Sequence, residues 1–130
     1  MILDTTFLID VMDEDDKAVA KLLDIIKKGE PQLITAPTIF ELFTGITRSK
    51  KPEQEKNKII KVLEGQIVVH LDNNSAEKAG EIDGNLMKDG KPIGVIDSMI
   101  AGIALIKKDK ILTRNIKDFS KIKGLEIETY

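Results

Sequence analysis

The stretch of sequence that decides the fold runs from residue 96 to residue 106 and reads IDSMIAGIALI. It is the most apolar part of the chain, yet it is too short to cross a bilayer and long for a strand. We therefore expect a helix that is buried around most of its circumference. Small side chains at Ala101 and Ala104, one and two turns beyond Asp97, would let a neighbouring element pack closely against it.

Short strands and amphipathic helices alternate on either side of this segment. Strands separated by helices are typical of an α/β sandwich around a mainly parallel sheet. The length of 130 residues fits one domain, residues 1–130. We expect strands at 2–3, 32–35, 67–71, 110–113 and 125–128, and helices at 5–12, from an acidic cap at 13–16 to 28, and at 37–48, 53–63 and 75–88, the last with a capping box at Asn74–Glu77.

Composition excludes several classes of site. The absence of cysteine rules out a disulfide framework, thiolate zinc sites and cysteine catalysis. A single histidine, His70, rules out a metal site with several histidines, and one tyrosine with no tryptophan leaves few platforms for base stacking. The net charge of −2 is too small to indicate a class of binding partner. With no long apolar run and no basic region at the N-terminus, we expect a cytoplasmic protein without membrane attachment.

Two acidic residues near predicted helix starts each have a structural explanation. Asp4 follows the first strand and could cap the next helix, since Asp is a favoured N-cap residue. Thr38 and Glu41 have the spacing of a capping box. Pro37, however, prefers the first helical position, which would place the cap earlier and leave Glu41 inside the helix. Both explanations stay open at this point.

The acidic positions in the second half are harder to explain structurally. Asp97 opens a helix with almost no solvent-facing side, where the helix dipole gains only about 0.3–1 kcal/mol. That gain is small beside the cost of burying an unpaired charge. Asn115 and Asp118 follow the strand at 110–113, and on their own they would fit a polar loop.

Taken together, these positions indicate a metal site. Ligands bind outside the carboxyl ends of parallel strands, and the acidic residues follow strands or begin helices at that rim. Two unit charges about 4 Å apart repel by roughly 4 kcal/mol at an effective dielectric near 20, which a divalent cation would relieve. Oxygen ligands without His or Cys favour Mg²⁺ or Mn²⁺. Such an ion is suited to phosphodiester hydrolysis, because it activates water and stabilises developing charge.

Four motifs in order resemble the PIN domain: ILDTTFLI at 2–9, TIFEL at 38–42, IGVIDSMIA at 93–101 and LTRNIKDF at 112–119. Their spacing and the chain length resemble VapC toxins of VapBC toxin–antitoxin systems. The resemblance covers essentially the whole chain. It implies a three-layer α/β/α sandwich and a Mg²⁺- or Mn²⁺-dependent endoribonuclease that is usually a homodimer and is inhibited by a VapB-type antitoxin.

The resemblance also implies roles for individual residues. Many members carry an acid where Asn115 stands, whereas others carry it three residues later, so Asp118 is expected to supply the charge and Asn115 to position water or metal. Thr6 and Thr113 match hydroxyl positions that orient the acids. Val95 replaces an acid found in some relatives, which counts against a full second metal site. The catalytic and metal-binding residues implied are Asp4, Glu41, Asp97 and Asp118.

The acidic site is flanked by a basic stretch. Residues 107–123 carry seven basic and two acidic side chains, and we expect Arg114 and Lys117 to hold RNA phosphates, although a solvated surface would look the same. The leading hypothesis is a VapC-type endoribonuclease acting on RNA. The alternatives are a PIN-fold RNA-processing nuclease without an antitoxin and a non-catalytic PIN-like binding module, which Asn115 and Val95 would favour.

Overall fold

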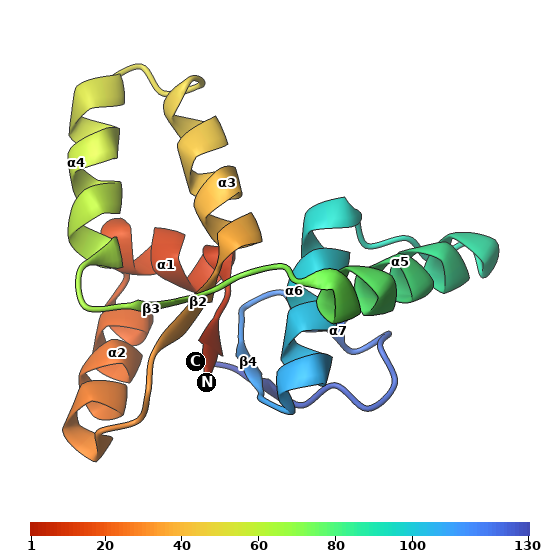
Figure 1. Cartoon of the computed structure of the whole chain (residues 1–130). Helices are drawn as coiled ribbons and strands as arrows, with labels where there is room; N and C mark the ends of the chain where they lie inside the picture. Colours follow the sequence, from red (N-terminus) through yellow and green to blue (C-terminus); the bar gives the residue numbers. More distant parts are fainter.

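Five short strands form one sheet in which all neighbouring strands are parallel (Figure 1). The computed structural model describes all 130 residues, and the strand order is β3-β2-β1-β4-β5. The strands are β1 (Ile2–Leu3), β2 (Leu33–Thr35), β3 (Ile67–Val69), β4 (Ile111–Leu112) and β5 (Ile127–Glu128). The helices are α1 (Thr5–Met12), α2 (Asp16–Lys28), α3 (Ala36–Ile46), α4 (Pro52–Leu63), α5 (Asn73–Lys88), α6 (Val95–Lys107) and α7 (Ile116–Phe119).

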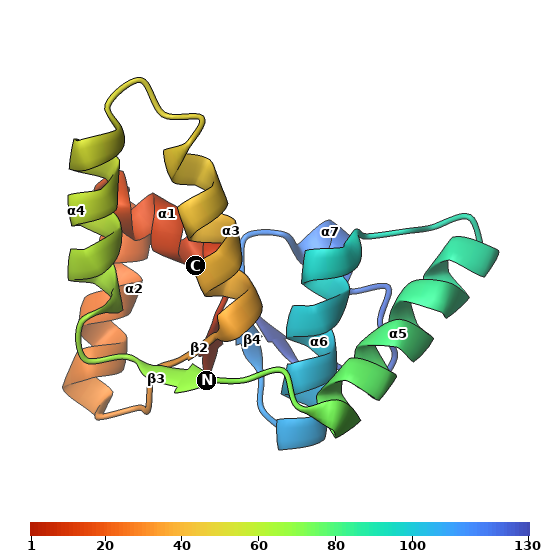
Figure 2. The same ribbon diagram turned by 45° about the horizontal axis from the view of Figure 1, so that its top comes forward.

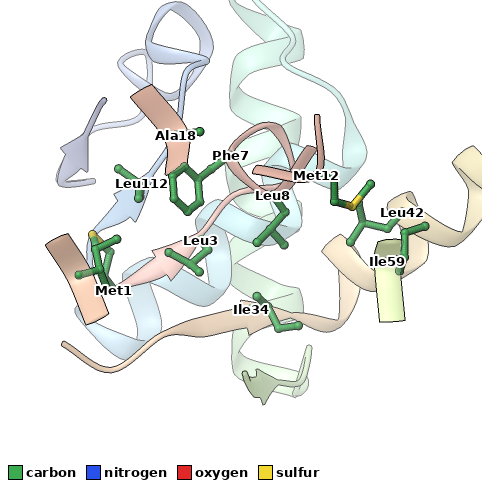
Figure 3. Packing of buried hydrophobic residues seen from close by; sticks show 11 residues of the cluster. Met1, Leu3, Phe7, Leu8, Met12, Ala18, Ile34, Leu42, Ile59 and Leu112 are labelled. Atoms are coloured by element: carbon green, nitrogen blue, oxygen red, sulfur yellow. The ribbon is translucent and has the colours of Figure 1, made fainter. Parts of the chain in front are cut away.

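The sheet separates two hydrophobic cores. Successive residues of a strand point to opposite faces, so Leu3 and Leu112 enter one core while Ile2 and Ile111 enter the other. The first core is closed by α1 to α4, and Figure 3 shows Phe7 packed beside Leu3 and Leu112 within it. The second core is closed by α5, α6 and α7. The predicted α/β/α sandwich is therefore confirmed, and its sheet is entirely parallel.

Helix α6 contains the apolar segment 96–106, and it packs against α5 (Figure 2). A Cβ atom added at Gly102 would lie 2.7 Å from the Ser75 carbonyl oxygen and 2.8 Å from the Ala79 nitrogen. Glycine at this position therefore allows the two backbones to meet. Ala101 and Ala104, whose small side chains were expected to allow close packing, are fully buried in the second core. No helix of the structure has the length and apolar character needed to cross a bilayer.

Helix α5 begins two residues earlier than the sequence predicted. The Asp72 side chain accepts a hydrogen bond from the Ser75 backbone N–H at 2.8 Å and caps the helix. The capping box expected at residues 74–77 was therefore wrong, because a better-placed carboxylate lies just upstream. The same hydrogen bonds lower the pKa of Asp72.

Candidate active site

Asp4 is the most deeply buried acid of the site, with only 1% of its surface exposed. It stands at the N-cap position of α1, but its side chain makes no capping hydrogen bond, so the capping interpretation is wrong. Instead its Oδ2 accepts hydrogen bonds from the hydroxyls of Thr6 (2.8 Å) and Thr113 (2.7 Å). Its Oδ1 is buried and has no hydrogen-bond partner. An unpaired buried oxygen of this kind is uncommon and calls for a ligand or ion.

The two hydroxyls are themselves held in place. Thr6 Oγ1 accepts a hydrogen bond from the Arg114 backbone N–H at 3.3 Å, and Thr113 Oγ1 accepts one from the Asn115 backbone N–H at 2.9 Å. Because these N–H groups occupy hydroxyl lone pairs, the hydroxyl hydrogens are left to point at Asp4. Residues from the start of α1 and the end of β4 thereby fix the plane of one carboxylate.

Asp97 lies in the first turn of α6 and is surrounded by negative charge. Its pKa is raised from 3.8 to about 7, mainly because burial disfavours the charged form and then because Asp4, Glu41 and Asp118 repel a further negative charge. Asn115 opposes this shift by donating a hydrogen bond from Nδ2 to Asp97 Oδ2 at 3.3 Å. The fold thus brings the four acids, which come from separate segments of the chain, into electrostatic contact.

Asn115 and Asp118 come from the segment that follows β4. Residues 116–119 form the short helix α7 rather than an open loop, and this turns Asp118 back toward Asn115. Asn115 Nδ2 donates to Asp118 Oδ2 at 3.2 Å as well as to Asp97. Lys121 Nζ lies 3.1 Å from Asp118 Oδ1. The hydrogen bonds from Lys121 and Asn115 lower the pKa of Asp118, so this carboxylate stays ionised.

Glu41 lies within α3 and is half-buried. The helix is capped by Thr35, whose Oγ1 accepts from the Thr38 N–H at 3.2 Å, so the capping box between Thr38 and Glu41 was a wrong interpretation. Pro37 takes the second helical position instead of the first. Glu41 therefore does not cap the helix, and its negative charge contributes to the raised pKa of Asp97.

The donor set fits a hard divalent cation. No group of three acidic side chains lies close enough to a common point to enclose an ion in the present arrangement. The unpartnered Oδ1 of Asp4 and the repulsion felt by Asp97 are nevertheless the features that a cation between these groups would relieve. Carboxylate oxygens with an amide nearby, and neither His nor Cys, are typical of Mg²⁺ or Mn²⁺ sites.

The basic residues predicted to contact RNA lie at the edge of the acids, and one has an unexpected partner. Lys117 is exposed, whereas Arg114 Nη1 lies 2.8 Å from Asp10 Oδ1. The other oxygen of Asp10 accepts a hydrogen bond from the Tyr130 hydroxyl at 2.6 Å. Sequence reasoning missed Asp10, and the only available signal was its spacing, one helical turn after Thr6.

A large cavity lies away from these acids. It has a volume of about 470 Å³ and is formed by α1, α2, α4 and the loop before β3. Phe7, Leu8 and Val62 are among its apolar lining residues, and none of the acids of the candidate site borders it. The cavity is therefore separate from the acids, which lie at the carboxyl ends of β1 and β4 and on the helices around them.

The chain belongs to the PIN domain family, which matches residues 1–125. Within that family its relatives are VapC ribonucleases. The tRNA(fMet)-specific endonuclease VapC of Salmonella typhimurium is 34% identical over 101 residues, covering 75% of this chain and 74% of that protein. Ribonuclease VapC2 of Rickettsia felis is 27% identical over 128 residues, covering 98% and 96%. A crystal structure of VapBC2 from Rickettsia felis bound to a promoter DNA fragment contains a chain with a TM-score of 0.88 and 26% identity, covering 99% of this chain and 97% of that one.

Proposed function

We propose that this protein is a VapC-type toxin, a divalent-metal-dependent endoribonuclease that hydrolyses phosphodiester bonds of RNA. The observation that carries the proposal is the buried Asp4 carboxylate, which has one oxygen fixed by two hydroxyls and the other left without a partner. The raised pKa of Asp97 supports it, because three further acids contribute their charge there. The names of the VapC relatives support the same activity.

Each residue of the site has a proposed role. Asp4, Asp97, Glu41 and Asp118 hold Mg²⁺ or Mn²⁺ and form the catalytic set. When bound, the ion supplies an activated water and stabilises charge on the phosphoryl oxygens. Thr6 and Thr113 hold Asp4 through Oδ2, which would leave Oδ1 available to the ion, and the Asn115 amide donates hydrogen bonds to both Asp97 and Asp118.

The proposed partners follow from the same family. DNA-bound VapBC complexes are known from Rickettsia felis and Salmonella typhimurium, so we propose a VapB-type antitoxin for this chain. A basic side chain of the antitoxin would enter the acidic site, since arginine pairs well with carboxylates. We further propose a single PIN domain over the whole chain, a homodimer, and a cytoplasmic site of action, where the RNA substrate is found.

Incubation of the pure protein with structured RNAs, initiator tRNA among them, tests the activity. We expect cleavage with Mg²⁺ or Mn²⁺, no cleavage with EDTA, and no cleavage by Asp97→Asn. Asp13→Asn is the matched control, since Asp13 is an exposed carboxylate outside the site. Cleavage that persists in EDTA, or that Asp97→Asn leaves intact, would rule the proposal out.

Val95 and Asn115 favour the non-catalytic alternative, and Asn115 does so more directly. Asn115 stands where many members carry an acid, and an amide is a weaker ligand for a hard cation than a carboxylate. Binding of Mn²⁺ to the pure protein separates the two: a catalytic site binds the ion, whereas a binding module lacks affinity even at millimolar Mn²⁺. A PIN-fold nuclease without an antitoxin is separated by the gene neighbourhood, since an antitoxin gene just upstream argues against it.

A further inference from the structure

Asp10 is a buried acid outside the proposed metal site, and both of its carboxylate oxygens are engaged. It is 8% exposed and lies on the same face of α1 as Thr6, one turn further along. Oδ1 pairs with Arg114 Nη1 at 2.8 Å, and Oδ2 accepts from the Tyr130 hydroxyl at 2.6 Å. We call Asp10, Arg114 and Tyr130 the Asp10 clasp.

Tyr130 connects the clasp to the hydrophobic core. Its ring packs edge-to-face on Phe7, with the ring centroids 5.0 Å apart, and Phe7 is fully buried. Burial and the neighbouring Asp10 raise the pKa of Tyr130, so the hydroxyl keeps its proton and remains a hydrogen-bond donor. Tyr130 therefore holds Asp10 through the carboxylate oxygen that Arg114 does not contact.

Arg114 connects the clasp to the acidic site. Its backbone N–H donates to Thr6 Oγ1, and that hydroxyl donates to Asp4. Its side chain is 63% exposed, whereas that of Asp10 is only 11% exposed. A guanidinium has five N–H donors, so one nitrogen rests on Asp10 while the others face solvent. An ion pair this exposed on one side adds little to stability, so a stabilising role does not explain why Arg114 pairs with Asp10.

We propose that Asp10 and Tyr130 are positioning residues that hold the Arg114 guanidinium at the edge of the carboxylate site, where it binds an RNA backbone phosphate adjacent to the one that is cleaved. The inference rests on the proposed function and deepens it. Four acids repel the phosphates of the substrate, so a cation is needed beside them. An unrestrained arginine would instead pair with those acids. Asp10 holds it outside them, with the fork of its guanidinium free for a phosphate.

Asp10→Asn tests positioning directly, because the two explanations predict opposite signs. If Asp10 were only a nearby negative charge, its removal would tighten RNA binding. If it positions Arg114, its removal weakens binding although the surface becomes more positive. We expect KM for RNA cleavage to rise about tenfold in Asp10→Asn, with a smaller effect on kcat. We expect a similar rise in Arg114→Gln and partial rescue in Arg114→Lys.

Binding of a single-stranded RNA, measured by fluorescence anisotropy in the Asp97→Asn background, provides a readout that does not require cleavage. The slope of log K against log salt concentration should fall by about 0.7 in Arg114→Gln and in Asp10→Asn, since one phosphate contact is lost. Lys56→Gln, which removes an exposed charge from α4, is the matched control and should leave slope and KM unchanged.

Tyr130→Phe keeps the ring on Phe7 and removes only the hydroxyl, so it decides the question if Asp10→Asn fails to fold. Thermal melting establishes that each variant is folded. Tighter RNA binding by Asp10→Asn, or an effect of Arg114→Gln that neither Asp10→Asn nor Tyr130→Phe shares, would overturn the inference. Absence of cleavage by the unaltered protein would instead overturn the proposed function, and the anisotropy series would still test the clasp.

Discussion

Replacing Asp97 with asparagine should stabilise the isolated protein while it abolishes activity. The folded state holds the Asp97 proton with a pKa of about 7 against an ordinary value of 3.8. At about 1.4 kcal/mol per unit, this difference corresponds to roughly 4 kcal/mol above pH 7. Asp97 is only half-buried, so solvent screening reduces the effect to about 2 kcal/mol.

The sign follows from which state binds the proton more tightly. Because the folded state does, the stability linked to this group is complete below pH 4 and is lost as the pH rises from about 4 to about 7. The asparagine of the Asp97→Asn variant cannot ionise, so the variant escapes this loss. It should therefore match the parent protein at pH 4 and exceed it by about 2 kcal/mol at pH 8, or roughly 8 °C in Tm for a domain of this size.

Urea unfolding in EDTA at the two pH values measures this difference, with Asp13→Asn as the control for loss of an exposed carboxylate. Saturating Mn²⁺ at pH 8 should cancel the advantage of the variant, since an ion at 100 times its Kd stabilises the parent protein by about 2.7 kcal/mol. A variant that is no more stable than the parent at pH 8 in EDTA would show that burial and the neighbouring acids do not raise the pKa of Asp97 in the folded protein.

Three further predictions follow from the same geometry. Gly102→Ala forces a Cβ against the Ser75 and Ala79 backbone and should lower the free energy of unfolding by about 1–3 kcal/mol, measured by thermal melting. Gly84→Ala in α5, which has open space around it, is the control and should raise the free energy of unfolding by up to about 1 kcal/mol. A Gly102→Ala variant as stable as the parent would contradict the close approach of α5 and α6. Thr113→Val removes a hydrogen bond to Asp4 and should reduce cleavage about tenfold, while Thr113→Ser retains most of it, and equal rates for both would exclude an orienting role. Mn²⁺ affinity, measured by calorimetry, should fall by about tenfold per pH unit below pH 7 because Asp97 must lose its proton, and a constant affinity down to pH 5.5 would refute that requirement.

The sequence predicted the layers well because local rules determine them. The helix predicted to end at residue 28 does end there, because Gly29 takes the left-handed conformation that glycine tolerates. The period of two in β1 and β4 sends neighbouring side chains into different cores. Helix starts were less predictable. Thr35 caps α3 and Asp72 caps α5, and in each case other polar residues nearby satisfied the same local rule equally well.

The candidate site, like the fold, could be predicted from the sequence only in part. The four acids could be singled out as residues that follow strands or lie near helix starts. The resemblance implied that Thr6 and Thr113 orient the acids, but no local pattern pairs Thr113 with Asp4, because the two lie 109 residues apart in the chain. The pairing of Asp10 with Tyr130 spans 120 residues and leaves no local pattern. Only the folded sheet, which sets β1 beside β4, makes these contacts possible.

The arrangement of Asp4 explains how a repulsive cluster persists in a folded chain. Leu3 of β1 and Leu112 of β4 are fully buried next to each other in the first core, so the strand ends that lead to Asp4 and Thr113 are fixed by the core and not by the acids. The two hydroxyls satisfy only one oxygen of Asp4, and burial with the neighbouring acids raises the pKa of Asp97. Under the proposed function, a bound cation would pair with the second oxygen of Asp4 and relieve the repulsion at Asp97. Stability gained by removing a charge and activity lost by removing it therefore have the same physical origin.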